Sequence, residues 1–152
     1  MVCLESLSEN NVKVVINKCY GGFGLSHEAV LRYFEIKGIT VYPEQGKDYW
    51  KFWTYWTVKP EDRIESKEGD AFYKMPIEER QAYNKAHSEQ TIYERNIERH
   101  DPALVQAVEE LGAKANGDHA ELSVVEIPDG INYEVEEYDG MEHIAEVHRT
   151  WY

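Results

Sequence analysis

The chain has 152 residues, which is enough for one domain with a sizeable apolar core. It carries 29 Asp and Glu against 16 Lys and Arg, a formal net charge of -13. This acidity disfavours duplex DNA and anionic membrane surfaces as direct ligands, because both require clustered basic side chains. Aromatic residues make up 12% of the chain, so an acidic disordered tail is excluded as well.

The sequence shows no membrane-directed or disulfide-rich pattern. Its apolar runs are far shorter than the roughly 20 residues of a membrane span, and the start MVCLESLSENN lacks the basic and then apolar pattern of a secretion signal. Two cysteines, Cys3 and Cys19, are too few for a disulfide framework or a four-ligand zinc site. We therefore expect a location in a reducing cytoplasm.

The first third predicts a strand, a glycine turn and a helix. Residues 1–11 are polar and predict an N-terminal extension, and VKVVIN at 12–17 predicts a buried strand. The turn CYGGFGLS follows, with Ser26 as the expected N-cap of a helix and Gly38 as its left-handed C-cap. The apolar stripe of this helix consists of Ala29, Val30, Tyr33 and Phe34.

The middle of the chain is dominated by aromatic residues. The stretch YWKFWTYWTV at 49–58 predicts a strand that is apolar on both faces and therefore central in its sheet or covered by a partner. Residues 59–75 form a charged, turn-like loop region. A helix is expected from Pro76 to about Ser88, and residues 91–99 fit either a continuing helix or a short strand.

The last third contains the clearest helix signal and a hairpin signal. Asp101 is the expected N-cap and Pro102 the first helical residue. A strand is predicted at 121–127, and alternating runs around Asp139-Gly140 predict a hairpin over 132–149. Residues 12–152 are therefore expected to form a single α+β domain, with an antiparallel or mixed sheet of about five to six strands and two to three packed helices.

Both ends of the chain carry specific motifs, namely VVIN and CYGGFGLS near the start, and DPALV, VEELG, EYDGMEHIAE and HRTW towards the end. These motifs resemble those of a family of small uncharacterised bacteriophage and prophage proteins. The similarity covers roughly half of the chain and leaves out residues 40–98. The resemblance implies no activity, but it implies a phage accessory protein that is made in the bacterial cytoplasm and blocks a host or defence component by binding it.

The glycine turn is the strongest candidate for a small-ligand site. A glycine-rich turn before a helix leaves backbone N–H groups free to bind phosphate, although neither the Gly-Lys-Ser/Thr nor the G-x-G-x-x-G pattern is present. The alternative is a tight connection in which the glycines provide positive φ angles and close packing. The candidate ligand-binding residues are Lys18, Tyr20, Gly21, Gly22, Phe23, Gly24 and Ser26.

Catalytic and metal-binding patterns are weak. Cys19 has no histidine partner in a local motif, so an inert structural cysteine is the favoured interpretation. His143 and His148 face opposite sides of a strand, and adjacent carboxylates such as Glu136 and Glu137 diverge. We assign no catalytic residue, metal or cofactor, and the sequence favours a protein that is not an enzyme.

The acidic excess is concentrated at the C-terminal end. Residues 101–152 hold 13 acidic side chains but only Lys114 and Arg149 as basic ones. Such a surface either is simply solvated or binds a basic surface on another protein. Tyr and Trp on the outer face of the aromatic strand are a second candidate contact. The candidate partner-binding residues are Glu134, Glu136, Glu137, Asp139, Glu142, Trp53 and Tyr55.

The sequence thus predicts non-catalytic binding to a host or anti-phage defence protein with a basic surface. The alternative is a nucleotide- or phosphate-binding protein, a ligand sequestrant or an enzyme, that uses the Gly21–Ser26 turn. The sequence leaves the formation of homo-oligomers open.

Overall fold

The computed structural model of the chain describes residues 11–151, which divide into two compact units. Unit 1 contains residues 11–38 and 97–151, and unit 2 contains residues 39–96. Within the described range there are four α-helices and seven strands, and all strand pairs are antiparallel. The predicted α+β class is confirmed. The predicted extension at 1–11 lies outside the described residues except for Asn11.

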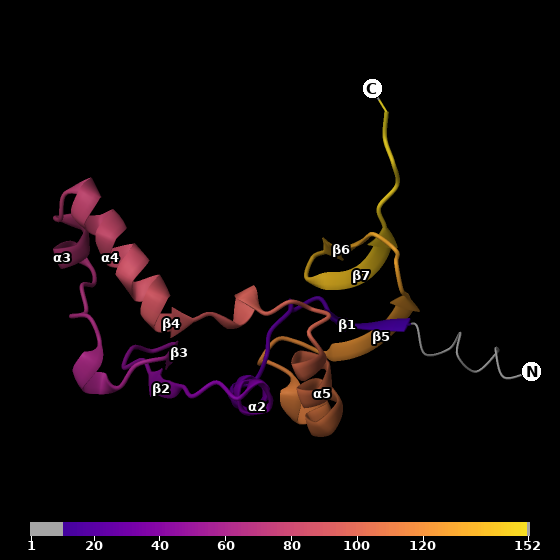
Figure 1. Cartoon of the computed structure of the whole chain (residues 1–152), viewed down its shortest axis with the longest axis horizontal. Helices are drawn as coiled ribbons and strands as arrows, with labels where there is room; N and C mark the ends of the chain where they lie inside the picture. Colours follow the sequence, from indigo (N-terminus) through magenta and orange to yellow (C-terminus); the bar gives the residue numbers. More distant parts are fainter. Residues whose placement is uncertain (1–10, 152) are drawn as a thin grey trace, which may run out of the picture. The chain divides into compact units, whose positions relative to one another are not determined.

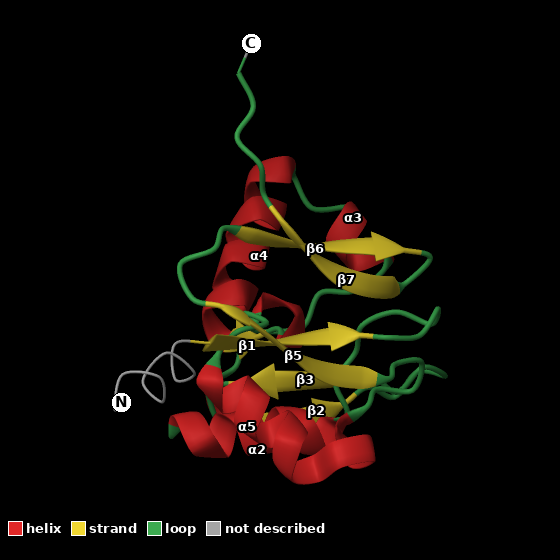
Figure 2. Ribbon diagram, turned by 90° about the vertical axis from the view of Figure 1, so that its right-hand side faces the viewer, coloured by secondary structure: helices red, strands yellow, loops and turns green. Residues whose placement is uncertain are grey.

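Unit 1 contains two pairs of strands and two longer helices. Strand β1 pairs with β5, and β6 forms a hairpin with β7. Helices α2 and α5 lie on one side of the β1–β5 pair and the β6–β7 hairpin on the other side (Figures 1 and 2). The bounds are β1 Asn11–Asn17, α2 His27–Lys37, α5 Pro102–Leu111, the short 3-10 helix η3 Gly112–Ala115, β5 Leu122–Pro128, β6 Tyr133–Tyr138 and β7 Met141–Glu146.

The core of unit 1 lies between the β1–β5 pair and the two helices. The residues predicted as the α2 stripe are all buried, and so are Leu104, Val105 and Val108 of α5. Strand β1 adds Val14, Val15 and Ile16, which are buried on both of its faces. The predicted caps are confirmed, because the Ser26 hydroxyl accepts the Ala29 N–H and the Asp101 carboxylate accepts the Ala103 N–H.

Unit 2 contains a three-stranded sheet in the order β2-β3-β4 and a longer helix, α4. The predicted loop region at 59–75 holds only two short helical turns, η1 and α3. The bounds are β2 Tyr42–Gln45, β3 Trp53–Trp56, η1 Pro60–Asp62, α3 Asp70–Tyr73, α4 Ile77–Gln90, β4 Thr91–Ile92 and the 3-10 helix η2 Glu94–Asn96. Among the described residues of both units, no helix is long and apolar enough to cross a membrane.

Two details of the predicted sheet differ from the structure. The described strands are distributed over three small sheets, because β3 pairs with β2 and β4 inside unit 2 and the β6–β7 hairpin pairs with no other described strand. The aromatic strand is central as expected, but it covers Trp53–Trp56 and not the whole of 49–58. The chain turns at Lys51, whose φ of 49° lies in the left-handed region, so the extended conformation of β3 cannot reach back to Tyr49.

Candidate functional site

The glycine turn of unit 1 packs against two other turns of the backbone. A Cβ atom on Gly21 would overlap the carbonyl oxygen of His119. A Cβ on Gly117 would lie 2.8 Å from the carbonyl carbon of Gly24, and one on Gly140 would lie 2.7 Å from the amide nitrogen of Gly22. Real Cβ atoms do not approach backbone this closely, so the glycines are needed for close packing between the turns.

The helix start next to this turn is also occupied by the protein itself. The Ser26 hydroxyl donates to the carbonyl of Lys114 at 2.6 Å and accepts the Ala29 N–H at 3.1 Å. The Ser26 N–H donates to the carbonyl of Ala115. These contacts use the hydroxyl that the phosphate-site hypothesis requires. Lys18 and Tyr20 are exposed, and the geometry favours a tight structural connection over a ligand loop.

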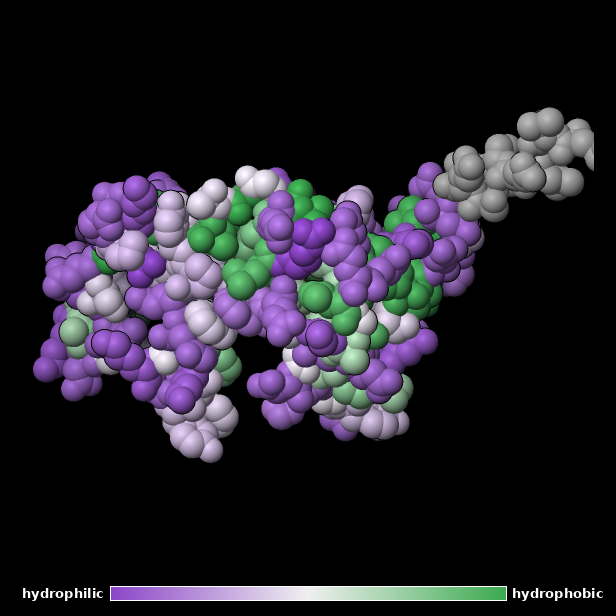
Figure 3. All heavy atoms as spheres, turned by 90° about the horizontal axis from the view of Figure 1, so that it is seen from below, coloured by the Kyte–Doolittle hydropathy of each residue, from purple (hydrophilic) through white to green (hydrophobic). Residues whose placement is uncertain are grey.

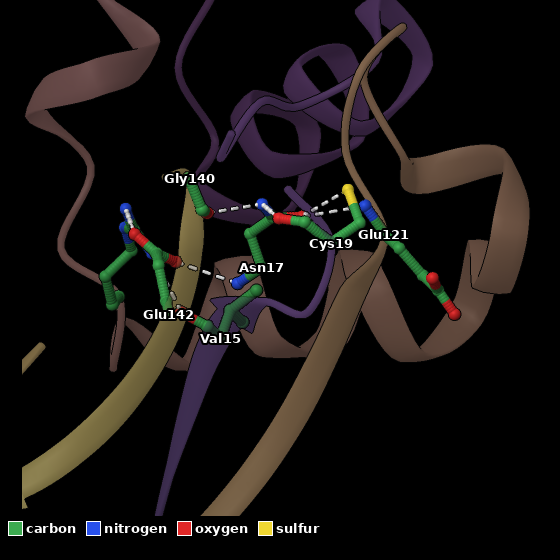
Figure 4. Close-up of polar contacts among 7 residues, drawn as sticks. Val15, Asn17, Cys19, Glu121, Gly140 and Glu142 are labelled. Carbon is green, nitrogen blue, oxygen red and sulfur yellow. Dashed lines mark hydrogen bonds and ion pairs between the residues drawn. The ribbon is translucent and has the colours of Figure 1, made fainter. Parts of the chain in front are cut away.

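Asn17, at the end of β1, is the centre of a buried polar network (Figure 4). Its side-chain NH2 group donates to the backbone carbonyls of Cys19 and Gly140. Its side-chain oxygen accepts a hydrogen bond from the Glu121 N–H at 2.8 Å. Its own backbone N–H donates to the Glu142 carboxylate at 2.8 Å. Every polar group of the Asn17 side chain is therefore paired, as a fully buried amide requires. The network joins the glycine turn, the start of β5 and the β6–β7 hairpin.

The thiol of Cys19 takes part in the same network. Its Sγ atom lies 3.4 Å from the side-chain oxygen of Asn17 and 3.2 Å from the carbonyl oxygen of His119. Both neighbours are hydrogen-bond acceptors, and neither is a base that could activate a nucleophile. The contacts support the structural interpretation of this cysteine.

Arg99 and Glu142 form a partly buried ion pair that extends the network. The guanidinium binds both carboxylate oxygens, at 2.7 and 2.9 Å, and also donates to the carbonyl of Val15. Its central carbon lies 3.3 Å from the centre of the Phe23 ring, which places the charge over the ring face. The Glu142 side chain is only 7% exposed, so its predicted role in partner binding is wrong. Its carboxylate holds the hairpin to β1 instead.

The β6–β7 hairpin presents the remaining predicted carboxylates to solvent. Val135 opposes Ile144 and both are half-buried, whereas Glu136 opposes His143 and the two side chains contact each other at 2.9 Å. Positive φ angles at Asp139 and Gly140 give the tight turn that the Asp-Gly pair predicts. We call the four exposed residues Glu134, Glu136, Glu137 and Asp139 the acidic hairpin.

The two predicted contact residues of unit 2 differ in accessibility. Tyr55 is only 5% exposed, and burial raises the pKa of its hydroxyl well above the ordinary value. It cannot contact a partner, which corrects the prediction. Trp53 remains partly exposed. The strand expected over 49–58 begins only at Trp53, so Tyr49, Trp50 and Phe52 precede it and lie on the surface.

Unit 1 also carries an open groove of about 580 Å³ between the start of β1 and α5. Hydrophobic side chains reach the surface on the side of the molecule that carries α2 and α5 (Figure 3). None of the residues predicted to bind phosphate lines this groove. Its lining residues are Asn11, Val12, Lys13, His100, Pro102, Val105, Gln106, Glu109 and Glu110.

Sequence reasoning missed the residues at the centre of the polar network. Arg99 and Asn17 have no local motif, and their contacts with the hairpin span 43 and 125 residues of the chain. A polar residue at the end of an apolar strand was the only signal for Asn17. Within residues 11–151, no group of three or more His, Cys, Asp or Glu side chains is arranged to hold a metal ion.

Comparisons with other proteins do not assign the chain to a family. No protein-family model, curated protein or solved structure matches the chain.

Proposed function

We propose that the protein acts by non-catalytic binding, with the acidic hairpin as its contact surface and a protein with a basic surface as its partner. The main support is a set of exposed carboxylates on a hairpin whose other face is held to β1 by a buried ion pair and buried amide hydrogen bonds. In the phage setting that the motifs imply, the partner is a host or anti-phage defence protein that this binding inhibits.

Preorganisation supports this proposal. Glu142 ties β7 to Arg99 and to the backbone of β1, while the Gly140 carbonyl accepts a hydrogen bond from Asn17. The turn that carries Asp139 is thus fixed before any partner arrives. A surface that is already ordered loses less conformational entropy on binding than a flexible acidic tail would.

The charge distribution supports the proposal as well. No Lys or Arg occurs between residues 118 and 148, so the hairpin carboxylates lack basic neighbours along this stretch of the chain. Within residues 11–151, Glu136 alone among the four has an ion-pair partner, the exposed His143. A concentrated negative field steers a basic partner into encounter and raises its association rate, an effect that salt screens.

The test compares two variants with the same loss of charge. In the hairpin variant, Gln replaces Glu134, Glu136 and Glu137. In the control, Gln replaces three exposed glutamates of unit 2, which are Glu61, Glu68 and Glu89. Tagged wild type and both variants are used to capture partners from lysate of infected cells, and association rates of the purified partner are measured at low and high salt.

We expect wild type and the control to capture the same basic protein. The hairpin variant should bind it at least tenfold more slowly at low salt, and the difference should shrink at high salt. Equal association rates for wild type and the hairpin variant would show that the acidic hairpin is only a solvated surface. Circular dichroism of the variants checks that the fold is intact.

A further inference from the structure

The connection between β2 and β3 carries a cluster of exposed aromatic rings. Tyr49 is 88% exposed, and Trp50 and Phe52 are each 69% exposed. The Trp50 and Phe52 rings are nearly parallel, with centroids 6.3 Å apart, and the Tyr49 ring meets the Trp50 ring edge-on. We call these three residues the aromatic tip. Such a cluster of large exposed rings on a water-soluble protein marks an interaction surface.

Hydrogen bonds in the loop hold the aromatic tip in place. The Gly46 N–H donates to the carbonyl of Phe52 at 2.8 Å, and the Lys51 N–H donates to the Asp48 carboxylate at 3.1 Å. The Gln45 amide donates to the carbonyl of Lys51. Lys51 adopts a positive φ, a conformation that costs energy for a residue with a side chain. The rings therefore project from an ordered turn.

The charge near the aromatic tip is balanced, unlike that of the C-terminal third. Lys47 and Lys51 lie beside Asp48, and residues 39–96 hold nine basic against eleven acidic side chains. Residues 101–152 hold two basic against 13 acidic ones. Two copies of this acidic chain repel each other least where the charges balance, and Lys47 or Lys51 of one copy can face Asp48 of the other.

The sheet edge next to the aromatic tip is protected against pairing with another strand. Strand β2 lies at the edge of the three-stranded sheet and contains Pro43, which has no N–H to donate. A contact through the side chains of the tip is therefore favoured over an extended sheet at this edge.

We propose that the aromatic tip packs against the same tip of a second copy of the chain and forms a two-fold symmetric dimer. A two-fold contact needs a self-complementary patch, and the near-neutral aromatic tip meets this requirement. Each of the two copies contributes three largely exposed rings of ~150–250 Å² each. The contact therefore buries roughly 700–1,100 Å² summed over both copies, below the ~1,600 Å² of a standard interface. The dimer is therefore weak and forms only at high protein concentration.

Sedimentation velocity of the full chain between about 5 µM and 1 mM tests the proposal. We expect the average mass to rise with concentration for the wild type. Trp50→Ser should raise the dimer dissociation constant at least tenfold, because a central tryptophan dominates such contacts. The control is Trp151→Ser, which removes an even more exposed tryptophan (85%) from unit 1 and should leave association unchanged.

Three outcomes would overturn the proposal. They are a wild type that stays monomeric up to 1 mM, a Trp50→Ser variant that associates as the wild type does, and a Trp151→Ser variant that loses association. A monomeric wild type that instead binds phosphatidylcholine vesicles would assign the tip to a lipid surface and overturn it too. Phe52→Ser is a second tip variant in case Trp50→Ser does not fold, as judged by circular dichroism.

Discussion

Units 1 and 2 differ sharply in how many apolar side chains they bury. Among the described residues, fifteen of the seventeen buried apolar side chains lie in unit 1, and only Tyr55 and Trp56 lie in unit 2. Helix α5 buries five of its ten residues, whereas α4 has fourteen residues and buries none. Since apolar burial is the main favourable term in folding, unit 1 has the larger reserve of stability.

Unit 2 relies on polar and cation–aromatic contacts instead. The Arg63 guanidinium lies 4.9 Å from the centre of the Trp56 ring and binds the Glu44 carboxylate at 2.9 Å. The Gln90 side chain accepts the Ile64 N–H and donates to the carbonyl of Asp62. Such contacts each contribute little to stability in water, so unit 2 should open at a lower free energy than unit 1.

The largest expected effect comes from the apolar core of unit 1. Leu104→Ala should lower the free energy of unfolding by about 2–5 kcal/mol, because Leu104 is fully buried and its loss opens a cavity. The matched change in unit 2, Ile77→Ala in α4, should cost less than about 0.5 kcal/mol because Ile77 is exposed. Urea denaturation measures both values. Equal costs would contradict the difference between the units.

The Arg99–Glu142 pair of unit 1, whose carboxylate is buried, should matter more than the Arg63–Glu44 pair of unit 2, whose carboxylate is exposed. Arg99→Met leaves the Glu142 carboxylate buried without its partner and should cost about 3 kcal/mol, the low end for such pairs because Arg99 is partly hydrated. Arg63→Met should cost about 1 kcal/mol, since the Glu44 carboxylate can be solvated. Thermal unfolding of both variants tests this order, and a larger loss for Arg63→Met would reverse it.

The smallest effect concerns helix capping. Helix α5 has the side-chain cap Asp101, whereas α4 begins after Pro76 without one. Asp101→Ala should cost about 1 kcal/mol at neutral pH. Although burial acts to raise the Asp101 pKa, hydrogen bonds from the Ala103 N–H, the Tyr33 hydroxyl and Lys37 bring it below the ordinary 3.8.

This lowered pKa makes the capping contribution depend on pH. The charged cap contributes stability above about pH 4, and that contribution is lost as the pH falls through the folded-state pKa. Asp101→Asn keeps a capping side chain without a titrating group, so its melting temperature should fall less than that of the wild type between pH 5 and pH 2. Glu110, whose pKa is lowered to about 2 by Arg32, is present in both proteins and does not affect the comparison.

Local patterns were sufficient for much of unit 1. The sequence predicted the strand at 12–17, both capped helices and the Asp-Gly hairpin, because each depends on residues within a few positions of one another. The four carboxylates of the acidic hairpin were predicted from the acidic excess of residues 101–152 and not from alternation along a strand. Residues 49–52 were misassigned, because strand propensity reports side-chain type and could not reveal the turn at Lys51.

Local patterns of residues are therefore enough to predict the α+β class, the capped helix ends and the acidic C-terminal region. Only the tertiary structure decided that Glu142 is buried against Arg99, that Tyr55 faces inward and that the glycine turn packs against the turns at Gly117 and Gly140. Local signals arise from hydrogen bonds between near neighbours in the chain. Burial and ion pairing depend on which distant segments meet, and this is settled only when the apolar core of unit 1 assembles.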